Sequence, residues 1–226
     1  MSLAVMTDQS SSLETLCPRI HPPSGQDWES LRACLSGGAR WEMGQDWLSE
    51  PEAGFAPAVV WTGHSGDRLH VLAELQDEEI FTSAAGKNDS LWLQGDVFEI
   101  FIGLRGHPGY IEYHIAPNGC TLQLLWPDAE ALMTTPQKGL PHFFAEDSAA
   151  VLRATHSAGG WTAYAEIPAS SIPGATTPLS GQVWDASFSR YDETPAARRT
   201  ILSTTSPHTQ AAWHRRTEWR ALRMAE

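Results

Sequence analysis

The chain has 226 residues, of which 42% are hydrophobic and 9% aromatic, and its 27 acidic and 15 basic residues give a formal charge of −12. This hydrophobic content is sufficient for a packed core, which excludes a disordered chain. The acidic excess argues against nucleic acid and against an anionic membrane surface as partners, because both require a basic footprint. We therefore expect a neutral ligand, or a cation such as calcium that oxygen ligands hold.

No segment approaches 18 continuous apolar residues, so we expect no membrane-spanning helix. The first twenty residues lack a charged region followed by a long apolar run, so no signal peptide is visible. Localisation stays open: cytoplasmic by default, or secreted where a native N-terminus has been replaced. The three cysteines are odd in number and show no CxxC spacing, which predicts neither a disulfide framework nor a zinc site.

Residues 1–56 are weakly patterned, and we expect them to form an irregular N-terminal arm whose loops lie on the remaining chain. Ten short segments rich in apolar residues follow, with turn signals such as HSGD, PNG and SAGG between them. They span residues 58–62, 69–76, 97–104, 110–116, 120–126, 149–156, 161–167, 183–190, 198–203 and 219–224. A helical turn is expected near 168–172. This pattern predicts an all-β, antiparallel sandwich, immunoglobulin-like or jelly-roll-like, over 57–226, as one structural domain together with the arm.

The strand predicted over 97–104 contains one charged residue, Glu99. Both faces of this strand are otherwise apolar. A buried carboxylate without a partner is costly, so Glu99 needs backbone N–H groups, a core arginine such as Arg190, or ligand hydroxyls. In the strand over 110–116, alternation places Tyr110, Glu112 and His114 on the face opposite the core.

Several segments, taken in their order and spacing, resemble the family 9 carbohydrate-binding modules and the related DOMON-like β-sandwich domains. They are LHVLAELQD, NDSLWLQGDVFEIFIGL, YIEYHIAPNG, GGWTAYAEIPASSI, GQVWDASFSRYD and TSPHTQAAWHRRTEWRALRM. The resemblance covers roughly residues 57–224. It implies a β-sandwich whose partner is a mono- or oligosaccharide and which is appended to, or associated with, a glycoside-active enzyme.

The resemblance also implies a site in which two Trp side chains enclose a terminal sugar while a Glu accepts its hydroxyls. Trp92, Glu99 and Trp213 match these positions, and His114 stands where the family has a binding Arg. Independently of the family, a sugar site needs flat aromatic surface beside a few fixed polar groups. Trp92, Trp213, Glu99, Glu112 and His114 supply that mixture. We therefore expect a sugar-binding module without catalytic activity.

Two alternatives from other functional classes stay open. One is a structural or interaction module that keeps the sandwich but has lost its ligand. The other is a haem-binding domain, because cytochrome-like members of the wider group hold haem through Met with His or Lys. Met133, Lys138 and His142 in the connection 127–148 are the candidates.

Metal and enzyme chemistry have weaker signals. The loop 77–96 is acidic, and Asp77, Asp89 and Asp96 are candidate ligands for the structural calcium that the resemblance implies, although no DxDxDG spacing is present. Glu99 and Glu112 could be imagined as a glycosidase pair. The sequence has no GxSxG, no GxxxxGK[ST] and no GxGxxG motif, so we expect no enzyme.

Overall fold

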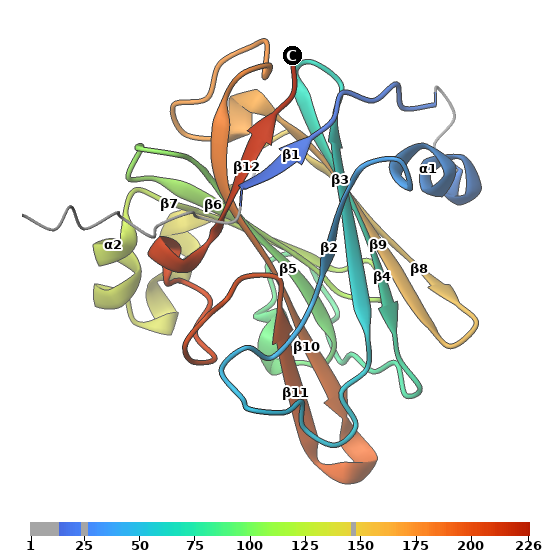
Figure 1. Ribbon diagram of the computed structural model, residues 1–226. Helices are drawn as coiled ribbons and strands as arrows, with labels where there is room; N and C mark the ends of the chain where they lie inside the picture. Colours follow the sequence, from blue (N-terminus) through green and yellow to red (C-terminus); the bar gives the residue numbers. More distant parts are fainter. Residues whose placement is uncertain (1–13, 24–26, 146–147) are drawn as a thin grey trace, which may run out of the picture.

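The computed structural model describes residues 14–23, 27–145 and 148–226, and these form two facing β-sheets (Figure 1). The seven-stranded sheet has the order β1 (Glu14–Cys17), β12 (Arg220–Met224), β10 (Val183–Thr194), β5 (Val97–Leu104), β6 (Tyr110–Ile115) and β7 (Thr121–Trp126), and β11 (Arg199–Thr204) pairs with the second half of β10. The five-stranded sheet has the order β2 (Ala39–Glu42), β3 (Ala58–His64), β4 (Arg68–Gln76), β9 (Gly160–Pro168) and β8 (Val151–Ser157).

The predicted all-β sandwich is confirmed. Each of the ten predicted strand segments corresponds to one of the strands β3 to β12, and the expected helical turn corresponds to η3 (Ala169–Ser171). All pairings between named strands are antiparallel except that of β1 with β12, which is parallel.

The main core fills the space between the two sheets, and period-two alternation selects its residues. On β5 the inward side chains are Phe98, Ile100 and Ile102, and on β6 they are Ile111, Tyr113 and Ile115. The five-stranded sheet contributes apolar side chains from β3, β4 and β9, and Trp161 is the largest of these. Burial of this apolar surface is the main favourable contribution to folding, at about 25 cal/mol per Å².

The N-terminal segment differs from the expected loops, because its described residues contain two strands and a helix. β1 and β2 extend one edge of each sheet, and α1 (Trp28–Leu35) lies beside β3 and β4. Leu31 and Leu35 anchor α1 on Leu72 and Tyr164. Strands of four residues are too short to show alternation in the sequence, so their pairing comes from the sheets they join. Residues 1–13 and 24–26 of the expected arm lie outside the described residues.

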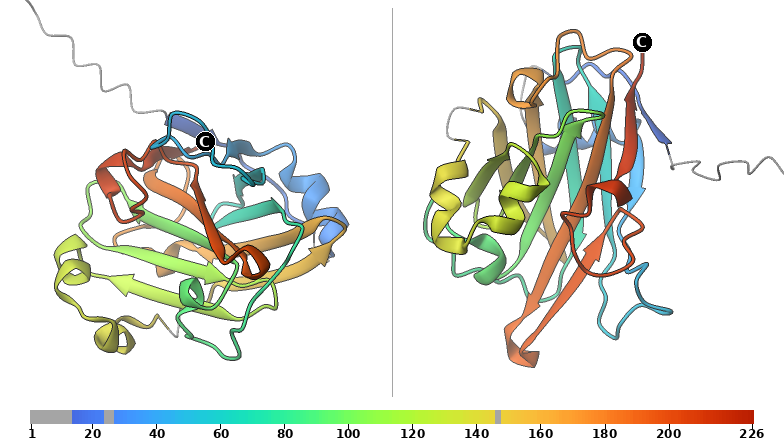
Figure 2. Two further views of the ribbon diagram at one scale, coloured as in Figure 1. Left: turned by 90° about the horizontal axis from the view of Figure 1, so that it is seen from below. Right: turned by 90° about the vertical axis from the view of Figure 1, so that its left-hand side faces the viewer.

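A second layer covers the outer face of the seven-stranded sheet. It comprises η1 (Leu91–Leu93), α2 (Ala129–Thr134), η2 (Gln137–Phe143) and the segment 205–219 with η5 (Arg216–Glu218), whereas η4 (Pro195–Ala197) caps the β10–β11 hairpin. In the right-hand view of Figure 2, α2 and η2 (yellow) pack on the seven-stranded sheet at its edge strand, β7. This layer encloses a second apolar cluster, separate from the main core.

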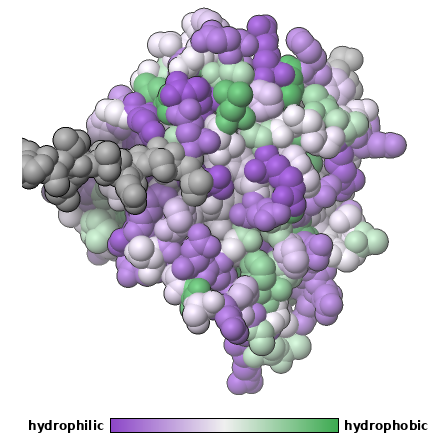
Figure 3. Space-filling view, viewed as in Figure 1, coloured by the Kyte–Doolittle hydropathy of each residue, from purple (hydrophilic) through white to green (hydrophobic). Residues whose placement is uncertain are grey.

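The molecular surface agrees with the acidic composition. The face shown in Figure 3 is mostly hydrophilic, and its hydrophobic residues form small separate patches. Within the described ranges, no helix has the length and apolar character needed to cross a membrane.

Candidate functional site

The outer face of β5 and β6 carries the polar residues that the sequence singled out. Register places Glu99 opposite His114 and Phe101 opposite Glu112, so the four side chains occupy adjacent positions on one face. β7 continues the same face with Leu122, Leu124 and Trp126. The face predicted from alternation for Tyr110, Glu112 and His114 is therefore the one that carries the second cluster.

A cavity of about 200 Å³ lies between this face and the covering layer. All five residues predicted to bind sugar, Trp92, Glu99, Glu112, His114 and Trp213, line it. The other lining residues are Phe101, Leu124, Trp126, Leu132, Leu140, Tyr191 and His214. The cavity therefore combines five aromatic side chains with two carboxylates and two imidazoles.

The two carboxylates are bridged by His114. Its Nδ1 lies 3.1 Å from Glu99 Oε1, and its Nε2 donates to Glu112 Oε2 at 3.2 Å. All three side chains are 2–3% exposed. Burial by itself lowers the pKa of His114, but attraction to Glu99 and the hydrogen bond to Glu112 outweigh it and raise this pKa to about 10. His114 is therefore an imidazolium at neutral pH.

Glu112 has a second imidazole partner. His214 Nδ1 lies 3.1 Å from Glu112 Oε1 and 3.1 Å from the Tyr110 hydroxyl. Burial raises the pKa of Glu112, but the charge of His214 and the hydrogen bond with His114 outweigh this effect and lower the pKa to about 2. Glu112 is thus a carboxylate throughout the neutral range. Glu99 does not pair with Arg190, the core arginine considered from the sequence.

The two tryptophans occupy different settings. Trp92 is partly buried, and its ring meets the His114 ring edge-on at a centroid distance of 5.6 Å. Trp213 is only 4% exposed, and its ring packs against the rings of Trp47 and Tyr191, at centroid distances of 5.5 Å and 6.3 Å respectively. Trp92 is therefore a wall accessible to a ligand, whereas Trp213 closes the cavity from the covering layer.

Some lining residues had a signal in the sequence and some had none. Phe101, Leu124 and Trp126 follow from alternation once the outer face is known, and His214 adjoins Trp213 in the chain. Leu132 and Leu140 belong to α2 and η2, in a connection where no strand or helix was predicted.

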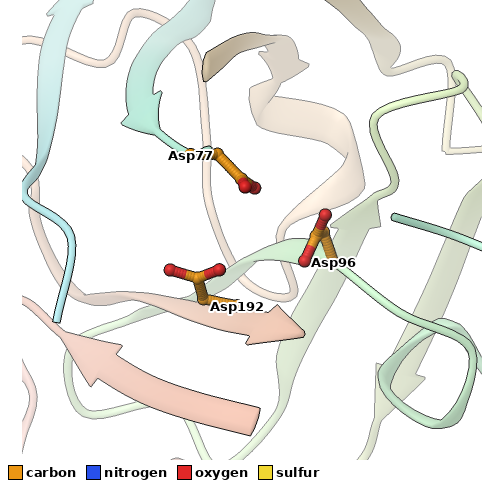
Figure 4. Close-up of side chains that lie close together, drawn as sticks. All are labelled: Asp77, Asp96 and Asp192. Atoms are coloured by element: carbon orange, nitrogen blue, oxygen red, sulfur yellow. The ribbon is translucent and has the colours of Figure 1, made fainter. Parts of the chain in front are cut away.

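The metal candidates divide between two places. Carboxylate oxygens of Asp77, Asp96 and Asp192 lie within 4.8 Å of one another, as Figure 4 shows, and all three residues are buried. Asp192 was not predicted. Asp89 lies elsewhere, because its carboxylate accepts the N–H groups of Ala85 and Gly86, each at 2.9 Å.

One guanidinium lies against this aspartate cluster. Arg190 is 3.2 Å from Asp77 and 3.0 Å from Asp192. Asp96 instead accepts two backbone N–H groups, from Phe81 at 2.5 Å and Glu193 at 2.7 Å. Arg190 compensates Asp77 and Asp192 but does not contact Asp96, and burial raises the pKa of Asp96 to about 7. Carboxylate oxygens suit calcium, whose charge would stabilise the ionised form of all three. Asp77, Asp96 and Asp192 therefore fit the calcium that the family resemblance implies.

Gly95 fixes the loop between η1 and β5. Its φ is +134°, and a Cβ there would lie 2.4 Å from the carbonyl oxygen of Phe81. Only glycine tolerates both conditions. This close approach holds the residues that precede β5 against the backbone of Phe81 and Thr82, so that the segment between them, which includes η1 and Trp92, forms a closed loop.

The candidate haem ligands lie on the surface. Met133 is 82% exposed in α2, and Lys138 and His142 are exposed in η2. Haem needs an enclosed apolar pocket around its ligands, and solvent-exposed side chains do not provide one.

No protein-family model and no curated protein matches the sequence. Solved structures do match in fold. A "putative carbohydrate-binding protein" from Bacteroides uniformis has a TM-score of 0.72 at 14% identity, and the match covers 95% of this chain and 100% of that one.

Two further matches are structures of a family 9 carbohydrate-binding module from Caldicellulosiruptor kristjanssonii. The complex with cellotriose has a TM-score of 0.58 at 15% identity, and it covers 94% of this chain and 93% of that one. The complex with glucose has a TM-score of 0.59 at 14% identity, and it covers 93% and 95%. The chain thus has the fold of a family 9 carbohydrate-binding module, as the sequence resemblance predicted.

Proposed function

We propose that the chain is a non-catalytic carbohydrate-binding module that holds a terminal or small sugar in the cavity on β5 and β6. The observation that carries this proposal is the convergence of Trp92, Glu99, Glu112, His114 and Trp213 on one cavity. These residues are up to 121 positions apart, so their meeting depends on the fold. The ligands in the similar structures, cellotriose and glucose, support the same class of ligand.

The chemistry of the cavity suits a sugar ring. Sugars present apolar C–H faces and a rim of hydroxyls, so they need aromatic walls and a few fixed hydrogen-bonding groups. A volume of about 200 Å³ is smaller than the roughly 300–1,000 Å³ of pockets for drug-sized ligands. It therefore suits one ring of a chain end better than the interior of a polysaccharide.

The two carboxylates are better suited to binding than to glycoside hydrolysis. A glycosidase needs one carboxylic acid that stays protonated to donate to the leaving group. The imidazoles instead hold the pKa of Glu112 at about 2, and the charge of His114 faces Glu99. In the proposed module, both carboxylates accept hydroxyls and neither transfers a proton. A glycoside-active enzyme would then be a partner, and this chain would supply attachment to the substrate.

Isothermal titration calorimetry with glucose and cellotriose tests the proposal. We expect both to bind, with quenching or a shift of tryptophan fluorescence. Trp92→Ala should weaken binding at least about tenfold, which corresponds to about 1.4 kcal/mol. Trp61→Ala is the matched control, because Trp61 is also partly buried but lies on β3 of the other sheet.

Trp213→Phe distinguishes a closing wall from a stacking platform. Because Trp213 packs on Trp47 and Tyr191, we expect Phe to keep the fold and lower affinity less than Trp92→Ala does. The absence of any heat or fluorescence change across a panel of neutral, amino and acidic mono- and oligosaccharides would reject the proposed function. The structural or interaction module would then be the better description.

A further inference from the structure

The two carboxylates of the cavity have unequal numbers of partners. His114 contacts both Glu99 and Glu112, whereas Glu112 has a second imidazole partner, His214, that Glu99 lacks. The lining residues that the structure describes include no lysine and no arginine. His214, whose side chain is 35% exposed, pairs with Glu112 and leaves the surroundings of Glu99 unchanged. The side of the cavity formed by Glu99 is therefore its more negative side.

Glu99 also has an unused oxygen. Its Oε1 faces His114, whereas its Oε2 is buried without a hydrogen-bond partner. Buried carboxylate oxygens in folded proteins are nearly always hydrogen-bonded, so an unpaired one in a cavity wall indicates a ligand donor. An ammonium group is the strongest such donor, because its hydrogen bond to a carboxylate is charge-assisted.

The aromatic walls favour the same charge. Five aromatic side chains line the same cavity as the carboxylates, namely Trp92, Phe101, Trp126, Tyr191 and Trp213. Ring faces attract cations through their quadrupole, and an enclosed cavity with little water strengthens that attraction. A carboxylate on the ligand would meet both the aromatic faces and Glu99 with unfavourable electrostatics.

A further unpaired group specifies the rest of the ligand. The indole N–H of Trp126 is buried without an acceptor, and Trp126 lines the cavity. It requires a ligand oxygen, which the hydroxyls of a sugar supply. A small aliphatic amine without hydroxyls would satisfy Glu99 and leave this indole unpaired.

We infer that the cavity selects an amino sugar, a pyranose with a free protonated amine, over the neutral and acidic sugars with the same ring. The inference rests on the proposed carbohydrate-binding function and specifies its ligand class. The amine pairs with Glu99 Oε2, and a ring or hydroxyl oxygen accepts from the Trp126 indole. No covalent step is involved.

A series of ligands with one ring geometry tests this inference on the wild-type protein. Calorimetry at pH 7 and constant ionic strength would compare glucosamine, glucose, N-acetylglucosamine and glucuronate, and then the galactose series. We expect the free amine to bind at least about tenfold more tightly than the neutral hexose, and the uronate at least about tenfold more weakly. N-acetylation should remove the advantage, because it removes the charge and keeps the ring.

Glu99→Gln identifies the residue responsible. The amide keeps the size of the side chain without its charge, so the preference for the amine over the neutral hexose should disappear. Glu74→Gln, on β4 of the other sheet, should leave that preference unchanged. The comparison between ligands needs only the wild-type protein, so it remains decisive even where Glu99→Gln fails to fold.

The possible results separate the two proposals. Equal or weaker binding of the amino sugar, with glucose still bound, overturns this inference and leaves the proposed function intact. Failure of every sugar to bind overturns both. Retention of the full amine preference in folded Glu99→Gln would exclude Glu99 as its source.

Discussion

The substitution His114→Gln tests how much the positive charge of His114 contributes to the stability of the protein. The substitution keeps a side chain that can hydrogen-bond but removes the imidazolium between Glu99 and Glu112. Glu112 retains His214 at 3.1 Å. Among the residues that the structure describes, Glu99 has an ion pair only with His114, so the variant leaves one buried carboxylate without a countercharge.

The expected cost follows from that single uncompensated charge. Removing one partner of a buried ion pair typically destabilises a protein by about 3–5 kcal/mol. For a chain of this size each kcal/mol lowers the melting temperature by about 2–4 °C. The variant should therefore melt roughly 6–20 °C below the wild type at pH 7.

Urea unfolding followed by tryptophan fluorescence, together with a thermal scan, measures this cost. The double variant Glu99→Gln/His114→Gln is the control, because it removes the stranded charge as well as its partner. We expect it to recover at least half of the lost stability. A loss below about 1 kcal/mol in His114→Gln, or no recovery in the double variant, would refute the argument that the imidazolium compensates a buried carboxylate.

Two further predictions concern pH and metal. The pKa of His114 is raised to about 10. Its contribution to the free energy of unfolding should therefore be complete below the unfolded pKa of about 6.5 and be lost as the pH rises toward 10. Urea unfolding between pH 6 and 10 should show this decline in the wild type and a flatter profile in His114→Gln. Calcium at millimolar concentration should raise the wild-type melting temperature, with reversal by EDTA and no response in Asp77→Asn, because the three clustered carboxylates share one guanidinium, Arg190, which contacts Asp77 and Asp192 but not Asp96. An unchanged melting temperature in the wild type would mean that Arg190 alone compensates the cluster.

The strands were predictable because each carries its own local signal. β4 and β6 alternate clearly, and turns such as the one at Gly119, with φ of +86°, need glycine. α1 and the short strands β1 and β2 have no comparable pattern, because their stability comes from packing on an existing sheet. The strands with which β1 and β2 pair could not be predicted either, since the parallel pairing of β1 with β12 joins residues about 200 positions apart.

The site was only partly predictable, for a related reason. Trp92, Glu99, Glu112, His114 and Trp213 were chosen from residue type and family spacing, and the cavity brings them together. Their interactions were not predictable. Nothing local indicates that His114 lies between two carboxylates, since this depends on the register of β5 with β6. Asp192 was missed because β10 ends far along the chain from the acidic loop that it faces.

The position of Trp213 shows how indirectly the fold determines the cavity. β10 lies between β5 and β12, so the segment 205–219 that connects toward β12 crosses the outer face of β5. Arg216 holds this segment by donating to the carbonyl oxygens of His107 and Leu104, each at 2.7 Å, in the β5–β6 turn.

Trp219 fixes Trp213 within this segment, because its indole N–H donates to the carbonyl oxygen of Trp213 at 2.6 Å while its ring packs on Tyr110 of β6 at a centroid distance of 5.3 Å. Backbone carbonyls occur at every residue, so no sequence pattern marks these acceptors. The aromatic wall of the cavity is therefore positioned by contacts with the end of β5 and with the β5–β6 turn, next to the strands that supply the charged groups. Affinity for a ligand should consequently depend on the attachment of 205–219 as well as on the side chains that touch the ligand.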